Sequence, residues 1–169
     1  GVDFSGIALC SEQNGYLCVD EQDRPLTPYV SWKDERSLEE VDGARTYDRV
    51  VDGLGDRFHA ISGWRPGPNL PLMSLTHAGR LSALRGRVRV LTLPEWLDLC
   101  CGESTRVVHD TMLHCHGFYD VRARRVSDEL VAFVEDAAGV RAEFAETAPT
   151  GTVSGYWRDG STRVPIYTG

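Results

Sequence analysis

Three histidines and a cysteine gather within a short stretch of the chain, and imidazole and thiolate groups are the common protein ligands of zinc. His109, His114 and His116 lie within eight residues, with Cys115 between the last two. Side chains two residues apart on a strand point to the same face, so His114 and His116 would converge there. No second pair with metal-binding spacing accompanies them. A zinc site at His114 and His116 is therefore one hypothesis, and hydrogen-bonded histidines in a loop are the alternative.

A second group of reactive side chains is the run from Trp32 to Arg36, which reads Trp-Lys-Asp-Glu-Arg. It combines a flat aromatic face, carboxylates and a guanidinium fork within five residues. Sugar-binding sites use this combination, because the ring packs against C–H groups while the charged groups bond to hydroxyls. The alternative is a buried tryptophan beside a surface ion pair between Asp34 and Arg36.

The motifs of several enzyme classes are absent from the sequence. No Gly-x-Ser-x-Gly turn supports an α/β-hydrolase nucleophile, and no Gly-x-Gly-x-x-Gly supports a dinucleotide site. Lys33 is the single lysine among 18 basic residues, and it follows Trp32 instead of a glycine. A phosphate-binding loop of the Gly-Lys-Ser/Thr type is therefore excluded.

Length, charge and cysteine usage limit the remaining classes. The chain has 169 residues, 41% of them hydrophobic, which is enough for one real core. A net charge of −7 argues against nucleic acid as a partner. The sequence contains no run of about 18 apolar residues, the length of a membrane span, so a membrane partner is not expected. Five cysteines, an odd number without a Cys-x-x-Cys pair, indicate reduced thiols and a cytoplasmic protein.

The elements that would position these groups alternate between strands and helices, which predicts the α/β class. In the first half, short strands are expected at 7–10, 16–20 and 29–32. Ser37 and Glu40 have the spacing of a capping box and predict a helix that ends near Gly53 and Gly55.

The second half continues the alternation. Asn69 and Pro71 are expected to cap and open a helix over 72–84. We then expect a half-buried strand at 88–91 and a short helix from Pro94 to Gly102. A helix from Ser127 to Gly139 and a hairpin around Asp159-Gly160 are expected after them. Residues 107–121 give no assignable pattern.

Taken in order, these segments resemble the N-terminal domain of the FGGY carbohydrate kinases, a family that includes xylulokinase, gluconokinase and glycerol kinase. The resemblance extends over nearly the whole chain. Four blocks match in order. The first is 7–15 with 17–20, and the second is 28–36. The third is Ser62-Gly63 with the helix after Asn69, 93–97 and Gly102-Glu103. The fourth is Asp110 with 119–121, 126–130, Gly139-Val140, 151–153 and Gly155.

The resemblance implies a partial actin-like ATPase domain of the ribonuclease H-like kind, with a mixed sheet and flanking helices. Family members use ATP and Mg²⁺ to phosphorylate a sugar or polyol hydroxyl, which requires positioning and charge stabilisation more than covalent help. Residues 1–169 are expected to be part of the N-terminal domain, without the upstream phosphate hairpin and the downstream catalytic aspartate. No catalytic residue and no metal ligand are therefore assigned within the chain.

The resemblance also suggests substrate-binding positions. They match the family's sugar-contact segment, its tryptophan block, a contact after the Ser-Gly loop and the aspartate of a Thr-Asp motif. These positions are Gln13, Asn14, Trp32, Asp34, Arg36, Asn69 and Asp110. His114 and Cys115 replace the Ala-Ser that follows in the family, and Gln13-Asn14 replaces Met-His.

Two functions follow as hypotheses. The first is a fragment of an ATP-dependent sugar or polyol kinase. Whether that protein forms a homodimer is left open. The second is a non-catalytic sugar-binding or regulatory protein with a degenerate kinase fold, which the altered pocket residues motivate. ATP turnover with a panel of ketoses, aldonates and polyols would separate them.

Overall fold

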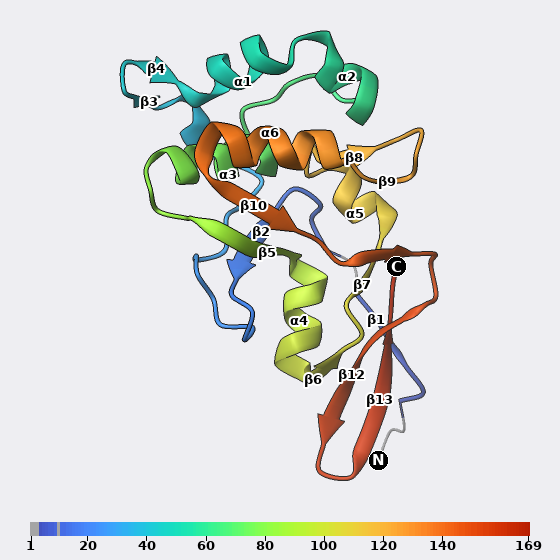
Figure 1. The fold of residues 1–169 in the computed structure, drawn as a ribbon. Helices are drawn as coiled ribbons and strands as arrows, with labels where there is room; N and C mark the ends of the chain where they lie inside the picture. Colours follow the sequence, from blue (N-terminus) through green and yellow to red (C-terminus); the bar gives the residue numbers. More distant parts are fainter. Residues whose placement is uncertain (1–3, 10) are drawn as a thin grey trace.

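Two larger β-sheets, three short strand pairs and the helices packed around them make up the computed structural model, which describes residues 4–9 and 11–169 (Figure 1). The helices are the 3-10 turn η1 (Arg36–Leu38), α1 (Thr46–Leu54), α2 (Asp56–Ser62), α3 (Pro71–Arg80), α4 (Leu93–Cys101), α5 (Asp110–His114) and α6 (Asp128–Ala138). In the described part of the chain, none of these helices has the length and apolar character that a membrane crossing requires.

Four strands form the larger sheet and three form the smaller one. The larger sheet has the order β1 (Ile7–Ala8), β13 (Thr162–Tyr167), β12 (Val153–Asp159) and β6 (Gly102–Ser104). The smaller sheet has the order β10 (Val140–Glu143), β5 (Gly86–Thr92) and β2 (Tyr16–Val19). Short pairs join β11 (Glu146–Ala148) to β7 (Val107–His109), β3 (Glu40–Val41) to β4 (Ala44–Arg45), and β8 (Tyr119–Asp120) to β9 (Arg125–Val126).

Both sheets are mixed. Strand β1 is parallel to β13, and β10 is parallel to β5, whereas the other pairs in the two sheets are antiparallel. Mixed sheets with helices against them confirm the α/β class that the alternation of strands and helices predicts.

The smaller sheet is covered on both faces. Alternate residues of β2 point to opposite sides: Tyr16 and Cys18 belong to the main core under α3 and α6, while Leu17 and Val19 pack with Leu91. Figure 1 shows α1, α2, α3 and α6 on one side of this sheet and α4 on the other. All four residues of β2 are buried, as expected for a strand with neighbours on both faces.

Helix α4 joins the two sheets. It contacts β2 and β5 of the smaller sheet and β6 and β12 of the larger one. Its first turn is closed by a capping box, in which Thr92 Oγ1 accepts from the Glu95 amide and the Glu95 carboxylate accepts from the Thr92 amide. The predicted helix from Pro94 to Gly102 is thus confirmed.

Other local predictions are confirmed as well. Ser127 caps α6 by accepting from the Leu130 amide, and Gly139 ends the helix in the left-handed conformation at φ 68°. Strands β12 and β13 form the expected hairpin, with Gly160 at φ 57° in its turn. Strands β1 and β2 also occur at the predicted places, although the predicted Cys10 lies outside the described residues.

The prediction of a helix starting at Ser37 is wrong. The Ser37 hydroxyl donates to the Pro68 carbonyl at 2.8 Å instead of capping a helix. A tight β3–β4 hairpin follows, with Asp42 at φ 51° and Gly43 at φ 74° in its turn, and α1 begins only at Thr46. An Asp-Gly turn therefore overrides the capping-box spacing.

The predicted strand at 29–32 is also wrong, since only Val30 pairs with the sheet. Its amide and carbonyl bond to Tyr16, and the chain then turns through a bond from the Asp34 amide to the Ser31 carbonyl. Helix α3 is shorter than predicted, because the chain turns after Arg80 and Ser82 takes φ 59°. Its N-cap position is Leu70 and not the predicted Asn69, and no side chain caps its first turn.

Close approach between α3 and α6 depends on Gly79. A Cβ atom at Gly79 would lie 2.6 Å from the Ala138 carbonyl oxygen and 2.8 Å from Val140 Cγ2. Substitution of Gly79→Ala should therefore lower the free energy of unfolding by roughly 1–3 kcal/mol, the usual cost of overpacking. Urea denaturation measures this, with Ala137→Ser, which adds one heavy atom to the exposed face of α6, as the control. Equal stability of the two variants would contradict the predicted contact.

Candidate functional site

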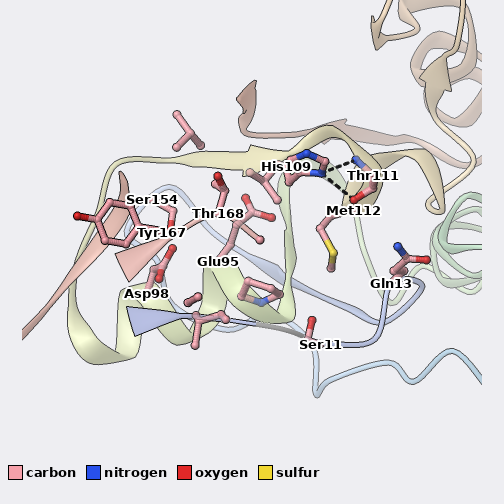
Figure 2. A pocket seen from close by; sticks show the side chains of 16 residues that line it. Ser11, Gln13, Glu95, Asp98, His109, Thr111, Met112, Ser154, Tyr167 and Thr168 are labelled. Atoms are coloured by element: carbon pink, nitrogen blue, oxygen red, sulfur yellow. Dashed lines mark hydrogen bonds between the residues drawn. The ribbon is translucent and has the colours of Figure 1, made fainter. Parts of the chain in front are cut away.

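A cavity of about 390 Å³ opens where α4 meets the ends of β1 and β13 (Figure 2). Its volume lies in the range of small-molecule sites. The residues at or directly after the carboxyl ends of the parallel strands β1 and β13 contribute to it, which is where α/β proteins commonly bind ligands. The polar lining residues are Ser11, Gln13, Glu95, Asp98, His109, Thr111, Ser154, Tyr167 and Thr168.

Two carboxyl groups on α4 face this cavity. Glu95 and Asp98 are three positions apart, so they lie on the same face of the helix, and their side chains are 3% and 1% exposed. Glu95 Oε2 accepts from the amide and the hydroxyl of Thr92 at 2.8 and 2.7 Å. Asp98 Oδ1, by contrast, is buried and has no hydrogen-bond partner among the described residues.

Gly155 on β12 makes room for Asp98. A Cβ atom there would lie 3.0 Å from Asp98 Cβ and 2.5 Å from the Glu103 carbonyl oxygen, so any side chain would displace helix or strand. The glycine lets α4 lie directly on the larger sheet with the Asp98 carboxyl enclosed between them.

Burial raises the pKa of both acids. The pKa of Glu95 is raised to about 7 by desolvation, against the hydrogen bonds from Thr92. The pKa of Asp98 is raised to about 6 by desolvation, against a bond from the Ser154 hydroxyl. No lysine or arginine lines the cavity in the part of the chain that the structure describes, so these carboxyl groups are its dominant charges.

The opposite wall carries the imidazole of His109, whose hydrogen bonds determine its tautomer. The Thr111 amide donates to His109 Nδ1 at 3.3 Å, and the Thr111 hydroxyl lies 2.8 Å from the same atom (Figure 2). An N–H donor requires an acceptor, so Nδ1 carries no proton in the neutral ring and Nε2 does. His109 can therefore present an N–H donor from Nε2.

Of the seven predicted substrate positions, Gln13 lines the cavity. Its Oε1 accepts from the Cys115 thiol at 3.4 Å, which ties the segment after β1 to the end of α5. Asn14 is next in the chain and half-buried, but it does not line the cavity.

Four other predicted residues form two linked pairs elsewhere. Asn69 Nδ2 donates to the Trp32 carbonyl at 3.1 Å, and the Trp32 side chain is 46% exposed. The Arg36 guanidinium donates two hydrogen bonds to the Asp34 carboxylate, at 2.8 and 2.5 Å. This pair lines a separate depression beside His77. Partial burial alone would raise the pKa of Asp34, but the hydrogen bonds and the charge of Arg36 together outweigh it and hold that pKa below its usual range.

Asp110 stands apart from the cavity. It begins α5 and accepts from Arg124 at 3.2 Å, while its neighbours His109 and Thr111 both line the cavity. The structure therefore gives Asp110 an ion-pair partner and not a place in the cavity wall.

The zinc hypothesis finds no support in the geometry. His116 is fully buried against Tyr16 and Phe144, whereas His114 meets the ring of Tyr119 edge-on at 5.0 Å. Desolvation lowers the pKa of His116 to about 4. Across residues 4–9 and 11–169, no three His, Cys, Asp or Glu side chains group as they would around a metal ion.

Sequence reasoning missed the two acids that dominate the cavity. Acidic residues on helices are usually solvated, so Glu95 and Asp98 carried no signal of burial. One clue was available, because Thr92 and Glu95 have capping-box spacing, which fixes where the helix begins and hence which face holds Asp98.

Comparisons with solved structures identify the fold class. The chain has the α/β architecture of the actin-like ATPase fold, as found in sugar kinases. Its path matches a xyloylose kinase from Brucella ovis with a TM-score of 0.75, 21% identity, and coverage of 98% of this chain and 34% of that chain.

Two further structures agree. A gluconate kinase from Lactobacillus acidophilus matches with a TM-score of 0.72, 14% identity, and coverage of 100% and 34%. A xylulose kinase from Rhodospirillum rubrum matches with a TM-score of 0.69, 17% identity, and coverage of 92% and 32%. The chain thus spans about a third of the length of these structures, and the expected resemblance to the FGGY sugar kinases is confirmed at the level of fold. No protein-family model and no curated protein matches the sequence.

The buried acids predict a pH-dependent stability. A carboxyl whose pKa is raised in the folded state holds its proton better when folded, so its contribution to stability is lost as the pH rises through the folded pKa. Asp98→Asn should therefore be more stable than the wild type at pH 7.5 by roughly 1–3 kcal/mol and about equally stable at pH 4. Urea denaturation at several pH values measures this, with the exposed Asp52→Asn on α1 as control. A constant difference across pH would contradict the burial of a titrating Asp98.

Proposed function

We propose that this chain is the sugar-binding part of the N-terminal domain of an ATP-dependent sugar or polyol kinase. The observation that carries the proposal is the cavity at the carboxyl ends of β1 and β13, within a fold shared with xylulose and gluconate kinases. In this proposal, residues 1–169 form part of that domain, and the phosphate hairpin and catalytic aspartate belong to the intact protein outside this segment.

The lining chemistry supports a polyhydroxylated ligand. Hydroxyls donate to carboxylates and accept from N–H groups, and the cavity offers both kinds of partner. Asp98 and Glu95 would accept from ligand hydroxyls, while the Nε2 of His109 and the amide of Gln13 would donate to them. Enclosure by Met112, Val107 and Val108 supplies apolar contacts for C–H groups.

The cavity does not suit the phosphates of ATP. A triphosphate needs lysine, arginine, backbone amides or metal to balance its charge, whereas the described cavity wall carries two carboxyl groups and no basic residue except His109. ATP and Mg²⁺ therefore remain cofactors proposed for the intact protein, bound mostly outside this segment. We place that protein in the cytoplasm, where the free thiols of Cys18, Cys100, Cys101 and Cys115 would stay reduced.

The first test measures ATP consumption by the intact protein with ketoses, aldonates and polyols. At least one class should stimulate turnover, and Gln13→Ala should raise its KM by about tenfold, the effect of losing one good hydrogen bond. Gln22→Ala, in an exposed turn, is the matched control. Sugar binding without any turnover would favour a non-catalytic sugar-binding protein instead.

A second test compares the two exposed tryptophans. Trp32 is 46% exposed and Trp64 is 41% exposed, and neither lines the cavity. Asn69 bonds to the backbone carbonyl of Trp32 and not to its ring, so the match to the kinase pattern alone proposes Trp32 as a sugar contact outside the cavity wall. We expect Trp32→Ala to weaken sugar binding by about tenfold, as loss of an aromatic contact would, and Trp64→Ala to have no effect. Calorimetric titration measures both, and equal affinities would remove Trp32 from the site.

A further inference from the structure

The cavity contains an acceptor that the described protein leaves unsatisfied. Asp98 is 1% exposed, lines the cavity, and its Oδ1 has no hydrogen-bond partner among the described residues. A buried oxygen without a partner costs stability even when it is uncharged. A ligand that donates to the Asp98 carboxyl would offset that cost.

The charge of the cavity favours one kind of donor. Glu95 and Asp98 lie one helical turn apart in the same wall, and no lysine or arginine lines the cavity among the residues described. Arg89 on β5 acts on Glu95 from outside the cavity, and Tyr167 and His109 are the other titratable groups in its lining. A positive ligand would meet two acids and no competing side-chain cation.

We propose that the cavity binds a sugar or polyol that carries a protonated primary amine, whose ammonium group is attracted to the neighbouring carboxyls of Asp98 and Glu95. This inference rests on the proposed function, because it narrows the class of sugar or polyol to amino sugars and amino polyols.

The carboxyl groups of Glu95 and Asp98 have lost most of their water before any ligand binds. Forming a buried ion pair usually costs about as much as it gains, because both ions lose water. Here the two carboxyls are already buried in the folded protein, as their raised pKa values reflect. Only the ammonium group must still be desolvated, so the interaction with the acids remains as net affinity.

The neutral-ligand alternative differs in a measurable way. A neutral polyol can donate to Asp98, but it gains no charge–charge attraction from Glu95. Replacing one hydroxyl by an ammonium group at the same position therefore separates the two cases, since size and shape hardly change.

The experiment is calorimetric titration of the intact protein at pH 7.5 with matched pairs, D-glucamine against D-sorbitol and D-glucosamine against D-glucose. We expect the amine of at least one pair to bind at least tenfold more tightly than its neutral partner. Asp98→Asn should remove this preference, and Glu95→Gln should reduce it while keeping the capping box. Asp52→Asn, at an exposed position of α1, should leave it unchanged.

Several outcomes would overturn the inference. Equal affinity within both pairs in the wild type, or a preference that survives in a folded Asp98→Asn protein, would do so. Absence of binding by all four compounds would do so as well. Phosphorylation of neutral sugars without any amine preference would overturn the inference alone, whereas an amine preference without phosphoryl transfer would support it and overturn the proposed kinase activity.

Discussion

The packing of α4 against both sheets is the constraint on which the rest of the site depends. Its apolar side chains fill the space under β2 and β5, and its opposite face lies on β12 through Gly155. A helix held against both sheets keeps Glu95 and Asp98 on its buried face, while Leu97 and Cys100 lie on its exposed face. The carboxyl groups of Glu95 and Asp98 are therefore held in a partly apolar cavity, and the fold bears the cost of their desolvation.

Much of the fold is predictable because its signals are local. Ser127 and Gly139 bound α6 through a cap bond and a left-handed turn that neighbouring residues determine. The hairpin of β12 and β13 follows from Asp159-Gly160 in the same way. Predictions failed where a distant partner decided the conformation: the Ser37 hydroxyl bonds to Pro68, 31 residues away, which no local pattern can reveal.

The residues of the candidate site show the same difference between local signals and distant partners. Gln13 is predicted because it lies in a segment whose type and order match a family pattern, and it lines the cavity. Its contact with a substrate stays a prediction. Asp98 was missed because its burial depends on β12, more than 50 residues further along the chain, and on the missing side chain of Gly155. Asp110 shows the converse, since it matches the pattern but is turned toward Arg124.

The charge of the cavity also constrains how a kinase built on this fold would separate its two substrates. Uncompensated carboxylates repel phosphate, so the acids on α4 would keep the nucleotide away from the part of the site that receives the sugar. The same repulsion would act on a phosphorylated product. In the proposed kinase, a transferred phosphoryl group would therefore have to point away from Glu95 and Asp98, and the α4 side of the cavity would hold the end of the ligand that does not react.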